Sequence, residues 1–291
     1  FFDSYKFESS NTSQYKQIGN AVPPMLGRFL ANQLKNQLDN NTIFDLFAGA
    51  GGMSLGFLNE GFKLGGSNEI VESYFNTYIK NHRGKCDKDN MILGDITNND
   101  IKNKIAEISK KNNVGVIIGG PPCQGLSLAG WRDPQDKRNQ LFRDYVSVVE
   151  QIKPEVFIME NVPGLLTMSS GKLIIEVISL FKSIGYKTLQ PFILSSENFG
   201  VPQRRKRVIL IGYKNKKIKI NTTPLFSYED SSLPNPVNVG EAIFSLPEIG
   251  IKEGEYSTSF DYIPKSLYDL YISEIINFDE FYKKSIELIK K

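Results

Sequence analysis

The chain has 291 residues, of which 40% are hydrophobic and 23% charged, with a formal net charge of +3. This predicts a globular protein with a large core, in one large domain or two smaller ones. No apolar run approaches the ~18 residues of a membrane helix, and no signal peptide is apparent. The two cysteines form neither a disulfide framework nor a zinc site, and a single histidine argues against a Ser-His-Asp triad. We therefore expect a cytosolic protein without membrane attachment.

The amino-terminal part of the chain predicts a loop followed by a helix. Residues 1–20 show no clear periodicity, and the Ser- and Asn-rich stretch 9–13 is typical of a loop. Pro23 and Pro24 suit the first turn of a helix. Apolar residues continue at helical spacing as Met25, Leu26, Phe29, Leu30, Leu34 and Leu38.

A glycine-rich turn, Ala48-Gly49-Ala50-Gly51-Gly52, follows a strand predicted at residues 42–47. Such a turn exposes backbone N–H groups and admits a ligand, although many are only tight turns. Glu69 lies 17 positions after Gly52, close to the spacing of an acid that binds the ribose of a nucleotide-like cofactor. Ser54 stands where a dinucleotide fingerprint requires glycine. The pattern predicts an adenosine-bearing cofactor other than NAD.

Predicted strands alternate with predicted helices as far as residue 213. The helices are expected at 71–81, 98–112, 140–151 and 173–184, and the strands at 91–96, 114–118, 155–163, 186–194 and 207–213. His82 is expected to be a surface residue or a helix cap. Residues 131–138 form a polar loop of the kind that can act as a lid. The alternation predicts a doubly wound, mainly parallel α/β sheet.

The stretch Gly119-Gly120-Pro121-Pro122-Cys123-Gln124-Gly125 follows one of these buried strands. The prolines fix φ, and the glycines allow another molecule to approach the backbone. Cys123 is thus expected at the carboxyl end of a strand, where open α/β sheets bind ligands. These residues alone leave two interpretations open, a nucleophilic thiol facing a pocket or a buried structural cysteine.

Charged residues near two later strands are similarly ambiguous. Glu160 is expected at the carboxyl end of its strand, as either a functional carboxylate or a solvated charge. The run Arg204-Arg205-Lys206-Arg207 could be a solvated patch or could bind phosphate or an anionic intermediate. After Lys214 the pattern weakens, with a short segment at 237–246 and a helical tail from Pro264.

Taken together, the motifs resemble the DNA (cytosine-5) methyltransferases of bacterial restriction–modification systems, over about residues 4–250. The matching blocks are FDLFAGAGG, SNEI, GDI, GGPPCQGLS, MENVPGLL, VPQRRKRV and QYKQIGNAVPP. The resemblance implies a Rossmann-like fold, S-adenosylmethionine as cofactor and double-stranded DNA as partner. It also implies methyl transfer to carbon 5 of a flipped-out cytosine, through a covalent cysteine adduct at carbon 6.

The resemblance assigns roles to individual residues. Cys123 matches the nucleophile, Glu160 the carboxyl that contacts cytosine, and Arg205 and Arg207 the arginines that support it. Gln124, Ser127 and Arg204 are expected to contact DNA, and no metal is required. The cofactor site comprises Phe47, Gly49, Ala50, Gly51, Gly52, Glu69 (ribose), Ile70, Asp95 (adenine), Ile96, Leu141 (packing on adenine), Asn20 (methionine end) and Ala21.

Two departures from the family pattern indicate a circularly permuted or split form. The IGNAVPP block normally closes the family's chain, whereas here it precedes the cofactor turn, an order that circular permutation tolerates. The residues after the 237–246 segment are too few for a target-recognition domain. We expect residues 1–213 to be the catalytic domain and 214–291 an incomplete small and recognition region. Recognition would then reside on a removed upstream segment or a second polypeptide.

Two rival functions follow from the same motifs. A tRNA cytosine-5 methyltransferase also lacks a large recognition domain, but that branch typically shows a Cys-Phe-Thr stretch, which is absent here. A non-catalytic DNA-binding subunit could use the same fold as a scaffold. The presence of Cys123, Glu160, Arg205 and Arg207 argues against it, because a scaffold has no need for all four.

Overall fold

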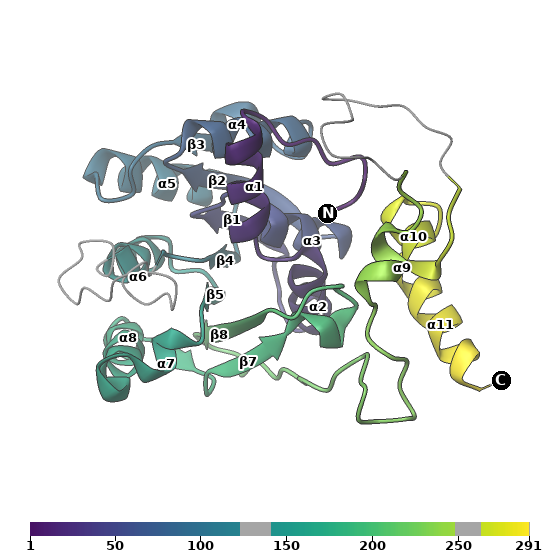
Figure 1. Cartoon of the computed structure of the whole chain (residues 1–291). Coiled ribbons are helices and arrows are strands. Elements are labelled where there is room, and N and C mark those ends of the chain that lie inside the picture. Colours follow the sequence, from purple (N-terminus) through teal and green to yellow (C-terminus); the bar gives the residue numbers. More distant parts are fainter. Residues whose placement is uncertain (123–140, 248–262, 291) are drawn as a thin grey trace. The chain divides into compact units, whose positions relative to one another are not determined.

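The computed structural model describes residues 1–122, 141–247 and 263–290, and it contains one mixed sheet of order β3-β2-β1-β4-β5-β8-β6 (Figure 1). Neighbouring strands from β3 to β5 run parallel, while β8 runs antiparallel to β5 and β6 and also pairs with β7. The mainly parallel sheet is thus confirmed. The strands are β1 (Thr42–Leu46), β2 (Lys63–Glu69), β3 (Met91–Leu93), β4 (Val116–Gly119), β5 (Val156–Asn161), β6 (Lys187–Thr188), β7 (Phe192–Ser195) and β8 (Lys206–Tyr213).

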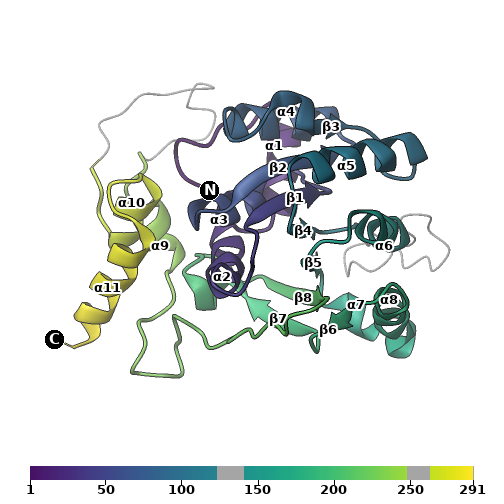
Figure 2. The same cartoon turned by 180° about the vertical axis from the view of Figure 1, so that it is seen from behind.

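Helices cover both faces of this sheet, as a doubly wound fold requires. α5, α6 and α8 lie in succession on one face, and α2 packs on α3 on the other (Figure 2). The helices are α1 (Asn11–Asn20), α2 (Pro24–Leu34), α3 (Gly52–Asn59), α4 (Glu72–His82), α5 (Asn99–Lys111), α6 (Leu141–Ile152), α7 (Gly164–Thr167), α8 (Lys172–Ser183), α9 (Val239–Ile243), α10 (Leu267–Ile272) and α11 (Phe278–Ile289).

Helix α1 forms where the sequence predicted a loop, and that prediction was wrong. Ser10 caps the helix by accepting a hydrogen bond from the Ser13 backbone N–H. Gln17 is the residue that the helix buries. An apolar stripe is therefore missing, and hydrophobic periodicity could not reveal the helix.

Two other predicted elements are divided. The strand expected at 186–194 is observed as β6 and β7, and Pro191, which has no N–H to donate, lies between them. The helical tail expected from Pro264 is observed as α10 and α11. Glu274, which lies between these helices, has a φ of 63°, which an α-helix does not accommodate.

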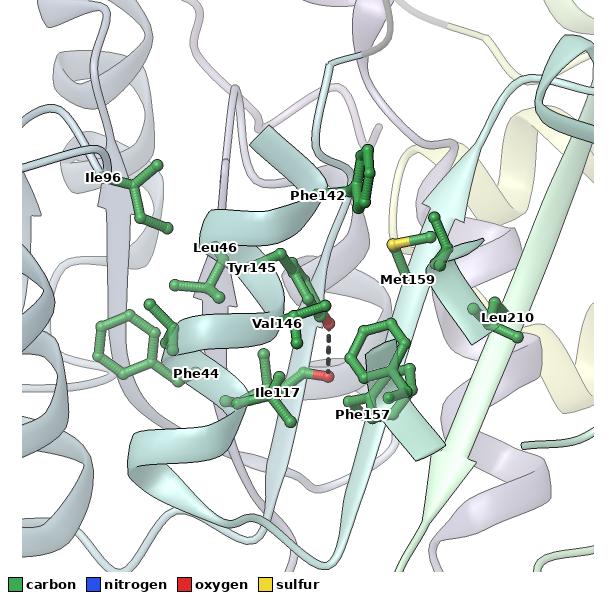
Figure 3. Close-up of a cluster of buried hydrophobic side chains, with 14 of the residues drawn as sticks. Phe44, Leu46, Ile96, Ile117, Phe142, Tyr145, Val146, Phe157, Met159 and Leu210 are labelled. Atoms are coloured by element: carbon green, nitrogen blue, oxygen red, sulfur yellow. Dashed lines mark hydrogen bonds between the residues drawn. The ribbon is translucent and has the colours of Figure 1, made fainter. Parts of the chain in front are cut away.

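The core between the sheet and α5, α6 and α8 consists of aliphatic and aromatic side chains (Figure 3). Phe157 on β5 stacks on Phe181 of α8 with ring centroids 3.7 Å apart. The buried Tyr145 hydroxyl donates to the Ile158 carbonyl at 3.0 Å and lies 3.4 Å from the Ile117 carbonyl. Tyr145 thus holds α6 against β4 and β5, the two strands that lead to the predicted catalytic motifs.

Residues Gly164–Ser183 are long and apolar enough to cross a membrane by length and composition alone. The helix is interrupted, however, because Ser169 and Ser170 have φ values of 50° and 57°. Within α8, Ile174, Val177 and Phe181 belong to the buried core cluster. α8 therefore packs one apolar face on the α/β sheet.

The chain divides into two compact units, and the larger one contains the sheet. In the smaller unit, the Asp3 backbone N–H donates to the Ile272 carbonyl at 3.1 Å, and Phe2 packs on Tyr271. The two ends of the sequence therefore belong to one unit. The larger unit comprises residues 6–194 and 206–222, and the smaller one residues 1–5, 195–205 and 223–291.

Truncating Phe181 tests the aromatic core. Phe181→Ala should lower the free energy of unfolding by about 3–5 kcal/mol, because the side chain is fully buried and stacked on Phe157. Ile175→Ala, on the same helix, removes a side chain that is 64% exposed and should cost about 0.5 kcal/mol or less. Urea denaturation measures the free energy of unfolding of both variants. Similar losses of stability would contradict the assignment of Phe181 to the buried aromatic core.

Candidate active site

Four parallel strands bring the predicted site residues to one edge of the sheet. β2, β1, β4 and β5 are consecutive neighbours in the sheet, so their carboxyl ends meet. The glycine-rich turn follows β1, Glu69 ends β2, Gly120 follows β4, and Glu160 lies near the end of β5. Ligands of open α/β sheets bind at this edge.

Glu69 fastens the glycine-rich turn to the start of α4. Its Oε2 accepts a hydrogen bond from the Gly49 backbone N–H at 2.7 Å. Its Oε1 accepts from the backbone N–H groups of Ile70 at 2.9 Å and Val71 at 2.8 Å. Burial raises the pKa of Glu69, and these three hydrogen bonds oppose that shift. The carboxylate is therefore a fixed feature of the turn, and Oε2 retains a lone pair for a ligand.

The residue next to Glu69 and the other predicted cofactor residues differ in burial. Ile70 is 59% exposed although it directly follows the buried Glu69, so it offers apolar surface beside a hydrogen-bond acceptor. Leu141 and Phe47 are partly buried. β3 ends at Leu93, earlier than predicted, and Asp95 lies in the turn beyond it, where Oδ1 accepts from the Thr97 N–H at 2.9 Å. Asp95 is exposed and Ile96 buried.

His82 is fully buried beneath the glycine-rich turn, so its prediction as a surface residue or cap was wrong. Its ring stacks on Tyr78 at a centroid distance of 4.1 Å, and Nε2 lies 3.2 Å from Ser54 Oγ. Gly51, with a φ of +82°, makes room for the ring, because a Cβ there would lie 2.4 Å from His82 Cε1. The helical spacing of residues around His82 does not reveal that Gly51, far away in the sequence, leaves space for its ring.

The carboxylate of Glu160 lies against the backbone that leads to Cys123. Arg207 Nε is 2.7 Å from Glu160 Oε1, and both side chains are largely buried. A Cβ on Gly120 would lie 2.6 Å from Glu160 Oε2, so a side chain there would displace the carboxylate. The structure thus brings together Glu160 and Arg207, as the motif resemblance implied.

Asn161, which the sequence analysis did not single out, holds the same segment. Its Nδ2 donates to the Pro121 carbonyl at 3.0 Å, and its Oδ1 accepts from the Val162 N–H at 2.9 Å. The side chain is 5% exposed. Only its position next to Glu160 at a strand end could have pointed to it.

For several other predicted site residues, the structure shows the position in the fold. Asn20, which is exposed, ends α1, and Ala21 follows it. Arg204 and Arg205 belong to the smaller unit, where the Arg205 carbonyl accepts from the Ser196 N–H and hydroxyl at 2.9 Å. Cys123, Gln124, Ser127 and the predicted lid at 131–138 lie outside the described residues.

A family model for C-5 cytosine-specific DNA methylases matches residues 1–36 and 41–277. The chain belongs to this family. It is 38% identical over 205 residues to Type II methyltransferase M.XorII of Xanthomonas oryzae pv. oryzae, covering 70% of this chain and 46% of the relative. It is also 38% identical over 216 residues to Type II methyltransferase M1.HphI of Haemophilus parahaemolyticus, covering 73% and 54%. The chain thus spans about half the length of these curated relatives.

A solved structure supports the fold of this family member. It is described as a DNA modification methyltransferase encoded within a prophage, from E. coli. It aligns with a TM-score of 0.57 at 29% identity, covering 72% of this chain and 56% of that one. The doubly wound sheet is therefore the methyltransferase type that the motifs implied.

The buried histidine predicts a specific dependence of stability on pH. Burial lowers the pKa of His82 from 6.5 to about 4, although its hydrogen bond to Tyr78 opposes the shift. Between these values the unfolded chain binds more protons than the folded one, so the free energy of unfolding falls as pH drops. His82 should account for a loss of about 2 kcal/mol between about pH 7.5 and pH 5.

Urea denaturation of the wild type and His82→Gln at both pH values measures this loss. The chain has one histidine, and contributions from its carboxyl groups are common to both proteins. The wild type should lose more stability on acidification than the variant does. Equal losses would show that His82 titrates normally in the folded protein.

Proposed function

We propose that this chain carries the catalytic apparatus of a DNA (cytosine-5-)-methyltransferase. It would transfer a methyl group from S-adenosylmethionine to carbon 5 of a cytosine flipped out of double-stranded DNA. The observation that carries the proposal is the buried Glu160–Arg207 pair against Gly120, at the sheet edge that also holds the turn fixed by Glu69. Family membership and the Type II relatives support DNA as the substrate.

The residues around the glycine-rich turn fit S-adenosylmethionine. Glu69 Oε2 would accept a ribose hydroxyl, and Ile70 and Leu141 would contact adenine. Asp95 and Ile96 would lie near the adenine, and Asn20 and Ala21 near the methionine end. When bound, the cofactor supplies an electrophilic methyl group. The remaining proposed contacts are with Phe47, Gly49, Ala50, Gly51 and Gly52.

Cytosine carbon 5 is a poor nucleophile, and Cys123 would solve this problem by covalent catalysis. The thiolate adds to carbon 6, and the electrons of the carbon 5–carbon 6 double bond make carbon 5 nucleophilic. Carbon 5 then forms its bond to the methyl group as the sulfonium–methyl bond breaks. A base removes the carbon-5 proton, the double bond re-forms and the thiolate leaves. The thiolate can reach carbon 6 only when the cytosine lies outside the stacked duplex.

Glu160 would act on the ring edge of the flipped base. Arg207 Nε lies beside Oε1, and Oε2, which lies nearest Gly120, would contact ring nitrogen 3. A proton shared there as negative charge builds on the ring would contribute about 10²–10⁴-fold, the usual range for general acid catalysis. Arg205 would assist, while Gln124, Ser127 and Arg204 would contact the DNA.

We further propose that target recognition depends on protein outside this chain, on an upstream segment or a second polypeptide. The matched part covers about half the length of these relatives. In the permuted arrangement, residues 1–213 form the catalytic domain and 214–291 the start of the small and recognition region. The enzyme would act on bacterial nucleoid DNA in the cytosol.

Removing the Glu69 carboxylate should weaken cofactor binding. Glu69→Ala removes the proposed acceptor for the ribose and the hydrogen bond from the Gly49 N–H. The binding free energy of the cofactor should therefore weaken by about 1–3 kcal/mol, the size of a hydrogen bond to a charged group. Glu72→Ala is the matched control, since Glu72 is exposed in the first turn of α4. Calorimetric titration with S-adenosylmethionine measures both. Unchanged affinity for Glu69→Ala would place the ribose elsewhere.

Covalent trapping tests the reaction itself. On DNA substituted throughout with 5-fluorocytosine, the enzyme should remain attached, because fluorine at carbon 5 blocks the final elimination. Cys123→Ser should abolish the adduct while leaving cofactor affinity intact. Cys86→Ser should trap normally, since burial raises the pKa of Cys86 to about 11 and keeps it a thiol. Absence of a wild-type adduct, or an adduct with Cys123→Ser, would contradict the mechanism.

A further inference from the structure

Asn68 occupies the next-to-last position of β2, directly before Glu69. Its partners in the sheet register are Leu46 on β1 and Ile92 on β3, the strands that lead to the two turns of the proposed cofactor site. Asn68 is 2% exposed, so a polar side chain at this place needs partners within the protein. Asn68 thus lies between the glycine-rich turn and the turn that carries Asp95.

The side-chain amide of Asn68 donates hydrogen bonds to the end of β3 and to the turn beyond it. Its Nδ2 lies 2.9 Å from the Gly94 carbonyl oxygen and 3.2 Å from the Ile92 carbonyl oxygen. The two amide hydrogens therefore match two acceptors. β3 ends at Leu93, so the Gly94 carbonyl lies beyond the strand pairing of the sheet. It receives its hydrogen bond from a side chain instead.

Both peptide groups of Gly94 are thereby bound to β2. The Gly94 N–H donates to the Glu69 carbonyl at 2.9 Å, and the Gly94 carbonyl accepts from Asn68. Because a peptide group is planar, fixing the Gly94 carbonyl also fixes the direction in which the chain enters Asp95. The exposed carboxylate of Asp95 uses Oδ1 to accept from the Thr97 N–H, and Oδ2 can accept from a ligand.

The backbone of Asn68 contacts the other turn. Its carbonyl accepts from the Ala48 N–H at 3.0 Å, next to the Gly49 N–H that donates to Glu69. This backbone contact does not depend on the side chain at position 68, whereas the contact with Gly94 requires a donor. Aspartate and leucine are similar to asparagine in shape but have no N–H to donate. The amide is therefore the feature that links the two turns.

We propose that Asn68 is a positioning residue that fixes Asp95 relative to Glu69, and thereby sets the spacing between the adenine and ribose contacts of the cofactor. The amide of Asn68 acts on the turn after β3, while its backbone leads directly into Glu69 on β2. The identity of the ligand rests on the proposed function, whereas the hydrogen bonds to Gly94 and Ile92 do not.

Hydrogen exchange measured by NMR tests these hydrogen bonds without any cofactor. The side-chain amide protons of Asn68 should exchange with solvent at least about tenfold more slowly than those of Asn98, which is exposed. The reason is that an amide bonded to two buried carbonyls must break these bonds before it exchanges. Equal exchange rates for the two side chains would overturn the proposal.

A double-mutant cycle tests the positioning role. Asn68→Ala should weaken S-adenosylmethionine binding about tenfold in calorimetric titration, because the Gly94 carbonyl loses its donor and the turn shifts. In the Asp95→Ala background the same change should weaken binding by no more than about twofold, because the carboxylate that Asn68 positions is gone. A tenfold loss in both backgrounds, or no loss in either, would overturn the proposal.

Asn112→Ala is the matched control. The Asn112 Nδ2 donates to the Gly65 carbonyl at 2.7 Å, near the amino end of β2 and away from both turns. This variant should lose stability in urea denaturation but bind S-adenosylmethionine as the wild type does. An equal loss of affinity in Asn112→Ala would overturn the positioning role, because destabilisation alone would then explain the effect. Failure of the wild type to bind would refute the proposed function and leave the exchange result standing.

Discussion

The buried ion pair between Glu160 and Arg207 is the contact on which the proposed base-binding side of this edge depends. It exists because β8 runs antiparallel to β5, with Glu160 opposite Ile209, so that Arg207 lies two residues along the same face. Removing one member of such a pair leaves an uncompensated charge, typically at a cost of about 3–5 kcal/mol. The pair thus fixes one carboxylate oxygen and presents the other to the backbone before Cys123.

On the proposed cofactor side of the edge, side chains form hydrogen bonds to the backbone of the glycine-rich turn. Glu69 accepts from Gly49, and Ser54 donates to the Gly51 carbonyl. Asn161 plays a comparable part for the other loop by donating to Pro121. Both loops are consequently held by residues on neighbouring strands and helices. This is the preorganisation that catalysis by positioning and electrostatics requires.

The sequence predicted the sheet, its helices and the strand-end position of Glu69 and Glu160, because strong apolar runs and glycine-rich turns are local signals. It missed α1, whose buried residue is the polar Gln17, and it misplaced His82 on the surface. The burial of His82 depends on the missing side chain of Gly51 and on Ser54, both about 30 residues away in sequence. Asn161 was missed for the same reason, since its partner is Pro121. Such long-range complementarity leaves no periodic trace in one sequence.

Tritiated methyl transfer from S-adenosylmethionine tests the central claim most directly. The chain would be assayed alone and together with a protein that supplies the proposed recognition function, on mixed-sequence DNA and on tRNA. We predict transfer to carbon 5 of cytosine in DNA, with full rate and site specificity only when the recognition protein is present. Transfer to tRNA and not to DNA, or no transfer under either condition, would contradict the account.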